Sequence, residues 1–96
     1  MRLALHLLLL FTLLIAPMNL SGQSALRRAI SQFERGEYYE ALQYYKSLMD
    51  NDYKFDVEDR IRIAHCYYQL NNIDEALNIF LELEEEGHQL SGYDLF

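Results

Sequence analysis

The chain has 96 residues, of which 15 are acidic and 8 basic, so its formal net charge is −7, and it contains one cysteine. This surplus of carboxylates argues against nucleic acid as a partner, because binding phosphates requires a basic surface. A single cysteine can form no disulfide within the chain, so the sequence is not that of a small secreted domain held together by disulfides. Its stability must come from packing.

Residues 1–24 have the three-part layout of an export signal. Arg2 supplies positive charge directly after Met1, and residues 3–18 are almost entirely apolar. Small and polar side chains then follow as far as Ser24. A charged start, an apolar middle and a tail of small residues are typical of a secretory signal peptide.

Cleavage of this segment is the first prediction. A transmembrane helix needs about 20 apolar residues, and Pro17 would break or kink a helix at the end of this run. We therefore predict cleavage after Gly22 or Ser24 and export to the periplasm or cell envelope. The alternative is that residues 3–20 stay in place as a membrane anchor. Cleavage would remove Arg2 and leave 7 basic against 15 acidic residues.

The rest of the chain repeats itself at an offset of 35 residues. Gly36 falls on Asn71, and both residue types tolerate the left-handed backbone conformation that ends a helix. We therefore expect a chain reversal at the same point of each copy. The other matching pairs are Glu40-Ala41-Leu42 with Glu75-Ala76-Leu77, Ala29 with Ala64, Phe33 with Tyr68, Tyr45 with Phe80, and Leu48 with Leu83.

Each copy is predicted to form two helices. In the second copy Asp56 can cap a helix that ends near Leu70, and Asn72 with Glu75 resembles a capping box that starts another of about 14 residues. The side chains expected to face the core of this copy are apolar and lie at helical spacing. They are Val57, Ile61, Ala64 and Tyr68 in the first helix and Ile73, Ala76, Leu77, Phe80 and Leu83 in the second. The core side chains expected in the first copy are Leu26, Ala29, Ile30 and Phe33, then Tyr38, Ala41, Leu42, Tyr45 and Leu48.

These residues resemble the tetratricopeptide repeat family. Ile63-Ala64-x-x-Tyr67 followed by Ala76-x-x-x-Phe80 is similar to its pattern of leucine, glycine and tyrosine, then alanine and phenylalanine, and Ala41-x-x-x-Tyr45 repeats the second half. Arg60 departs from the pattern, which has tryptophan there, no proline closes either copy, and the period is 35 where the family has 34.

The resemblance implies an all-α fold of two helix-turn-helix repeats stacked as a short right-handed α–α solenoid. We expect the first repeat over residues 25–55 and the second over residues 56–90. Residues 91–96 are then the start of a third repeat or a tail, and residues 1–24 form the preceding signal helix.

The sequence gives no evidence of catalysis, a cofactor or a metal site. His65 and Cys66 are adjacent, so on a helix their side chains point about 100° apart, and no second histidine or cysteine pair lies at ligand spacing. We predict that Cys66 is a buried structural residue. The chain lacks a glycine-rich phosphate loop and a nucleophile beside a base, so we expect it not to be an enzyme.

Members of this family bind partners mainly on the concave surface formed by the first helix of each repeat. Transferred to this sequence, that surface consists of Leu26, Ile30, Phe33, Ile61, His65 and Tyr68. Its apolar, partly aromatic character suits an extended or helical peptide, or a second copy of the protein. A membrane is a partner only if the N-terminal segment is retained.

The function implied is therefore a scaffold or assembly module that mediates protein–protein interaction in the periplasm or cell envelope. Two alternatives remain open at this point. One is a membrane-anchored adaptor subunit, and the other is a regulatory fragment of a larger protein whose catalytic domain lies elsewhere.

Overall fold

The computed structural model describes residues 22–88, and within this range the chain is helical throughout, apart from its turns. Most of the predicted signal segment and the predicted start of a third repeat, residues 91–96, lie outside the described residues. The all-α class is confirmed for the described part. Its helices cover residues 22–34, Tyr38–Asp50 (α2), Val57–Gln69 (α3) and Ile73–Glu85 (α4).

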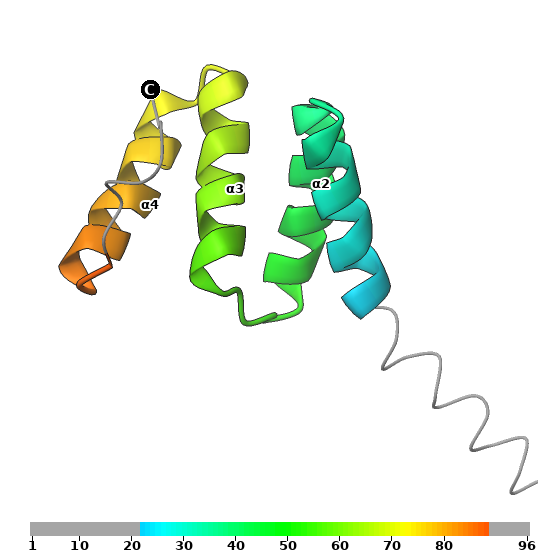
Figure 1. The fold of residues 1–96 in the computed structure, drawn as a ribbon, viewed down its shortest axis with the longest axis horizontal. Helices are drawn as coiled ribbons and strands as arrows, with labels where there is room; N and C mark the ends of the chain where they lie inside the picture. Colours follow the sequence, from blue (N-terminus) through cyan, green and yellow to red (C-terminus); the bar gives the residue numbers. More distant parts are fainter. Residues whose placement is uncertain (1–21, 89–96) are drawn as a thin grey trace, which may run out of the picture.

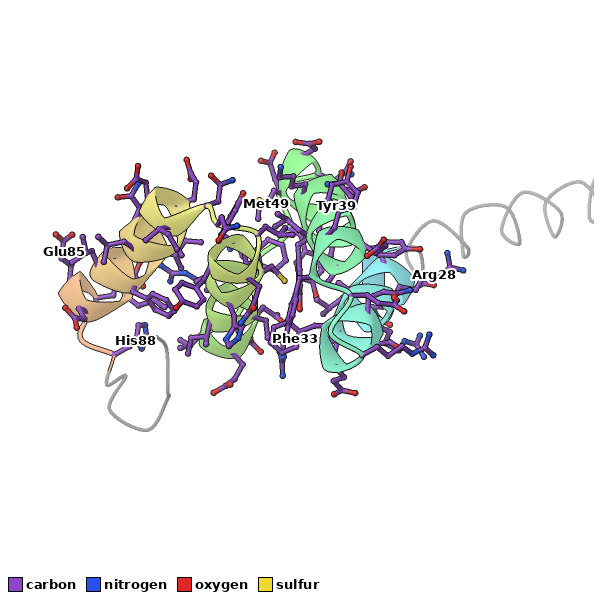
Figure 2. The ribbon with its side chains drawn as sticks, turned by 90° about the horizontal axis from the view of Figure 1, so that it is seen from above. Arg28, Phe33, Tyr39, Met49, Glu85 and His88 are labelled. Carbon is purple, nitrogen blue, oxygen red and sulfur yellow. The ribbon has the colours of Figure 1, made fainter. Side chains whose placement is uncertain are left out.

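Successive helices run in alternating directions and lie side by side (Figure 1). The contacts between α2 and α3 and those between α3 and α4 hold the stack together. Seen from above, the 22–34 helix and α3 lie toward one side of the molecule and α2 and α4 toward the other (Figure 2). The structure therefore consists of two helix hairpins packed against each other, as the 35-residue offset predicts. None of the described helices is both long and apolar enough to cross a membrane.

All four described helices end in the same backbone motif. The residue after each C-cap has a positive φ: 77° at Gly36, 54° at Asp52, 65° at Asn71 and 87° at Gly87. Its amide donates back into the last turn, and the next amide does so too, as in Gly87 N to Glu84 O at 2.9 Å and His88 N to Leu83 O at 3.0 Å. This is the Schellman motif, which satisfies carbonyls at the helix end.

The reversals at Gly36 and Asn71 are confirmed. Of the second pair, Asp52 lies in the 50–56 connection, whose asparagine and aspartates favour a turn, whereas the reversal at Gly87 was not predicted. The second pair is also 35 residues apart. The backbone therefore repeats at the end of both helices of each hairpin.

The helix starts agree only partly with the prediction. Asp56 caps α3 as expected, since its carboxylate accepts a hydrogen bond from the Asp59 amide at 2.8 Å. The capping box at Asn72 and Glu75 is wrong, because Asn72 occupies the N-cap position of α4 without making a side-chain cap. Its own amide, which Glu75 would have to bind, instead donates to Tyr67 O at 2.7 Å. The short turn after α3 thus engages the Asn72 amide, which would have to be the donor in a capping box.

The four alanines predicted at close helix contacts, Ala29, Ala41, Ala64 and Ala76, are completely buried. They lie in two core clusters that share α3. One cluster joins the first hairpin to α3 and contains Ala29, Ala41, Leu42, Tyr45, Ile63 and Cys66. The other joins α3 to α4 and contains Ile61, Ala64, Ala76, Phe80 and Leu83. Helix α3 therefore packs on both sides, which couples the two repeats.

The prediction for the core face of α4 is wrong at two positions. Ile73 is 44% exposed and Leu77 is 45% exposed. Leu42, the equivalent of Leu77 in the first copy, is only 3% exposed because it packs in the cluster that α3 completes. No element among residues 22–88 covers α4 in the corresponding way.

Candidate partner-binding surface

Three aromatic side chains from three helices meet between the two hairpins. Phe33 lies at the end of the 22–34 helix, Tyr38 at the start of α2 and His65 in the middle of α3. The ring centroids of Phe33 are 5.6 Å from those of both Tyr38 and His65, in edge-to-face geometry. The rings of Tyr38 and His65 are stacked at 5.9 Å with 27° between their planes. All three side chains are half-buried. We call these three residues the aromatic cluster.

Local structure explains how the cluster assembles. The left-handed residue Gly36 reverses the chain between Phe33 and Tyr38, so two rings only five positions apart can touch. His65 reaches them from the other hairpin because α3 packs against the first one. One imidazole nitrogen, Nε2, lies 3.3 Å from Gln69 Nε2, one helical turn further on. Each such ring pair contributes about 0.5–1.5 kcal/mol beyond its buried area.

The structure places the six sequence-predicted site residues in different surroundings. Phe33 and His65 belong to the aromatic cluster, and Ile30, one turn before Phe33, is half-buried. Leu26 packs against the first core cluster and Tyr68 against the second. Ile61 is only 6% exposed and belongs to the second core cluster, so it offers almost no surface to a partner.

Tyr38 was predicted from the sequence to be a core residue, yet it completes this surface. The surface that the fold assembles from first-helix residues is therefore centred on Ile30, Phe33 and His65, with Tyr38 added from α2.

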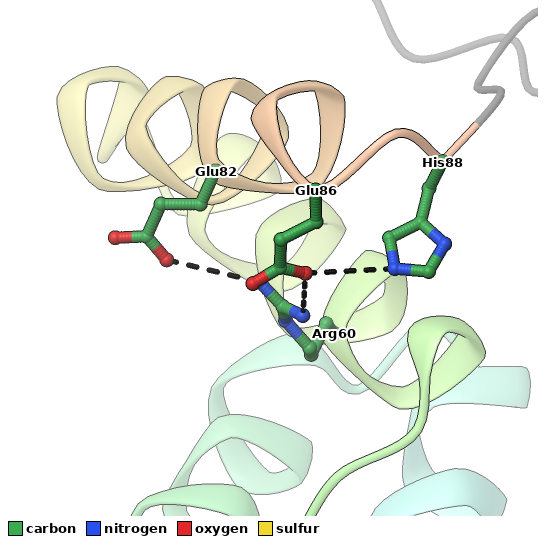
Figure 3. Close-up of polar contacts among 4 residues, drawn as sticks. All are labelled: Arg60, Glu82, Glu86 and His88. Carbon is green, nitrogen blue, oxygen red and sulfur yellow. Dashed lines mark hydrogen bonds and ion pairs between the residues drawn. The ribbon is translucent and has the colours of Figure 1, made fainter.

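Arg60 forms a separate polar contact at the end of α4 (Figure 3). Its guanidinium donates to both carboxylate oxygens of Glu86, at 2.5 and 3.2 Å, and lies 3.8 Å from Glu82. His88 Nε2 is 3.5 Å from the same Glu86 carboxylate. The hydrogen bond from Arg60 lowers the pKa of Glu86.

This contact gives Arg60, which replaces the family's tryptophan, a role in tying α3 to α4. It also provides a partner for Glu82 and Glu86, which belong to the acidic run at the end of α4. Such exposed pairs contribute little to stability.

A buried carboxylate lies where α3 meets the first hairpin. Asp59 is 4% exposed and accepts a hydrogen bond from Arg62 Nη1 at 3.2 Å. Burial and the neighbouring charge of Asp56 raise the pKa of Asp59. Burial likewise raises the pKa of the Tyr45 phenol, which is completely buried in the first core cluster. The Asp59 carboxylate and the Tyr45 phenol both lie in the packing between helices. The sequence pattern did not predict that Asp59 is buried.

Cys66 is fully buried, as predicted, and burial raises the pKa of its thiol to about 12. At neutral pH it is therefore a protonated, inaccessible side chain and a poor nucleophile or metal ligand. The part of the chain that the structure describes contains no group of three or more His, Cys, Asp or Glu side chains that could hold a metal ion.

Helix hairpins stacked at a fixed period, with a partly exposed aromatic surface between them, define a protein of the helical-repeat class. A family model of the tetratricopeptide repeat matches residues 32–93, and the chain belongs to this family. Proteins with this repeat generally mediate contacts with other proteins. No match was found among curated proteins or solved structures.

Proposed function

We propose that this protein is an exported, non-enzymatic scaffold or assembly module of the periplasm or cell envelope. In this proposal it binds a peptide segment of a partner protein on the aromatic cluster and the neighbouring Ile30. Export is supported by the signal-like layout of residues 1–24. Membership of the tetratricopeptide repeat family supports the interaction role.

The observation that carries the proposal is the partial exposure of the aromatic cluster. Three rings that only stabilised the fold would be expected in the closed core, where Tyr45 lies at 0% exposure. Phe33, Tyr38 and His65 are instead only half-buried where the two hairpins meet. Aromatic side chains with one open side are typical anchors of protein interfaces.

The chemistry of this surface indicates what it binds. Ile30 and the rings offer apolar contact, and the imidazole of His65 offers one hydrogen-bonding group beside Gln69. Some family members clamp a peptide's terminal carboxylate with lysine and asparagine, but apolar residues and a histidine occupy those places here. We therefore propose that an apolar or aromatic side chain within the peptide is bound, with its backbone hydrogen-bonded to His65.

Site-specific photocrosslinking in the native host tests this proposal. A photoreactive amino acid replaces Ile30 in the full-length chain, and the matched control replaces Tyr39, which is 60% exposed on α2. We expect position 30 to give a discrete adduct with one partner, identified by mass spectrometry, and position 39 to give none. Adducts of equal yield from both positions, or none from position 30, would contradict the proposal.

Cell fractionation tests the export part separately. The protein should be recovered from the periplasmic or envelope fraction, and inhibition of signal peptidase should leave a longer, membrane-bound form. Recovery of an uncleaved form in the membrane without the inhibitor would favour the anchored alternative.

A further inference from the structure

One side of α4 carries three exposed aliphatic side chains in a row. Ile73 is 44% exposed, Leu77 45% and Leu81 47%. Residues four apart lie one above the other on a helix, so the three form a continuous line along α4. We call Ile73, Leu77 and Leu81 the α4 stripe. It lies on the second hairpin, away from the aromatic cluster, which joins the first hairpin to α3.

The internal repeat shows what kind of element fits this face. At the 35-residue offset, Leu77 corresponds to Leu42, which is 3% exposed in the cluster that includes Ile63 and Cys66 of α3. The alanines just before them, Ala41 and Ala76, are both completely buried. The two hairpins therefore pack alike internally, and Leu77 differs from Leu42 because no described helix covers Leu77 as α3 covers Leu42.

The charge around the α4 stripe restricts the occupant. Residues 73–88 contain six acidic residues and no lysine or arginine. Glu82 and Glu86 contact Arg60, whereas Asp74, Glu84 and Glu85 lie three or four positions from a stripe residue and so border it on the helix surface. A helix bound here is favoured if basic side chains flank its apolar face.

A second copy of the chain does not meet these requirements. Two α4 helices packed together would bring their carboxylates into opposition. The 22–34 helix of another copy would supply basic charge, but Arg28 and Ser31 stand where α3 has Ile63 and Cys66. Arg28 is exposed at the end of the molecule opposite Glu85 (Figure 2). That face offers polar groups where the α4 stripe needs aliphatic contact.

We propose that the α4 stripe docks an amphipathic helix of a separate protein, with an aliphatic face flanked by lysine or arginine. The bound helix would lie along α4 as α3 lies along α2, with its aliphatic face on Ile73, Leu77 and Leu81. Asp74, Glu84 and Glu85 would pair with its basic flanks. This is helix recognition by an apolar face with electrostatic selection. The site is independent of the proposed peptide surface at the aromatic cluster.

Two synthetic peptides of about 18 residues, roughly five helical turns, provide the test. Both carry the same leucine face, and the flanking positions are lysine in one and glutamate in the other. Fluorescence anisotropy with the full-length chain should show that the lysine peptide binds at least about tenfold more tightly. The Leu77→Gln and Leu81→Gln variants should each weaken its binding by about tenfold or more with unchanged circular dichroism. Ile30→Gln and Tyr39→Gln, which lie elsewhere, should have no effect.

Several results would overturn this proposal. Equal affinity for both peptides would show that charge plays no part, and full binding by Leu77→Gln would place the peptide elsewhere. A dimer in sedimentation experiments that Leu77→Gln abolishes would make a second copy the occupant. If Leu77→Cys in the monomeric protein resisted maleimide, another part of the same chain would cover the α4 stripe. Rapid labelling that the lysine peptide suppresses would support the proposal, since the native Cys66 is buried.

Discussion

Replacing leucine by alanine at two nearby positions of α4 tests the packing of the second hairpin. Leu83 is completely buried in the second core cluster, whereas Leu81, two residues earlier on the same helix, is 47% exposed. The substitutions Leu83→Ala and Leu81→Ala remove the same atoms and change helix propensity equally. Any difference in their effects therefore reports the surroundings of the two side chains.

The expected magnitudes differ clearly. Leu83→Ala loses the transfer free energy of a fully buried side chain and leaves a cavity, which costs about 2–5 kcal/mol. Leu81→Ala loses only about half of the transfer free energy of a buried leucine and leaves no closed cavity. It also gains slightly in helix propensity, so it lowers the free energy of unfolding by less than about 1 kcal/mol. A domain of this size has a free energy of unfolding of roughly 3–10 kcal/mol. Leu83→Ala therefore removes a large part of it.

Thermal and urea unfolding followed by circular dichroism provide the assay. Because 1 kcal/mol shifts the Tm of a small domain by about 4–8 °C, Leu83→Ala should lower it by roughly 10 °C or more and Leu81→Ala by only a few degrees. Equal shifts, or a larger effect of Leu81→Ala, would refute the orientation of α4 described above.

Three further predictions concern other parts of the molecule. The Cys66 thiol, with its pKa raised to about 12, should react with a thiol reagent only after unfolding in urea; reaction of the native protein at the rate of a free thiol would show that it is accessible. The Arg60 hydrogen bond lowers the pKa of Glu86 below its usual value of 4.5. The ionised Glu86 carboxylate therefore stabilises the folded state above that pH, and this contribution is lost as the pH falls through the lower pKa of the folded state. Melting between pH 3 and pH 7 should thus be less pH-dependent in Glu86→Gln, and an unchanged profile would show that the pair has no energetic role. The intact mass of the exported protein should correspond to a chain that begins at Gln23 or Ala25, whereas a mass that retains residues 1–20 would indicate an anchor.

Much of the fold could be predicted because the sequence repeats the features that determine it locally. Glycine or asparagine at equivalent positions indicated the reversals at Gly36 and Asn71, and Asp56 indicated its helix start. Asp52 has the same left-handed conformation without being glycine or asparagine, so residue type alone gave a weaker signal there. The capping box at Asn72 failed because two local motifs compete for one amide, and the sequence does not show which prevails.

Exposure was harder to predict than helix position. A helical pattern identifies which side chains share a face, but it does not reveal whether a neighbouring helix covers all of that face. Leu42 and Leu77 occupy equivalent positions in their repeats, yet only Leu42 is buried. The same limit explains why Ile61 was assigned to the binding surface and Tyr38 to the core, since both assignments depend on where the adjacent hairpin lies.

Contacts between residues far apart in the sequence were not predictable from spacing. Arg60 and Glu86 are 26 positions apart, so no helical periodicity connects them. The aromatic cluster was predicted in part, because Phe33 and His65 were both assigned to the binding surface formed by the first helix of each repeat. Its third ring, Tyr38, comes from α2 and was assigned to the core by the helical spacing of apolar residues.

The proposed function requires that the fold brings Phe33, Tyr38 and His65 together into one partner-binding surface. Nuclear Overhauser contacts between the ring protons of these residues test it most directly, because centroids 5.6–5.9 Å apart place ring protons within range. We expect contacts among all three rings. When the partner found by crosslinking at position 30 is added, the signals of these rings should shift selectively, with Tyr39 unaffected. The absence of contacts between His65 and the other two rings would mean that the hairpins do not form this surface, and the proposed function would be contradicted.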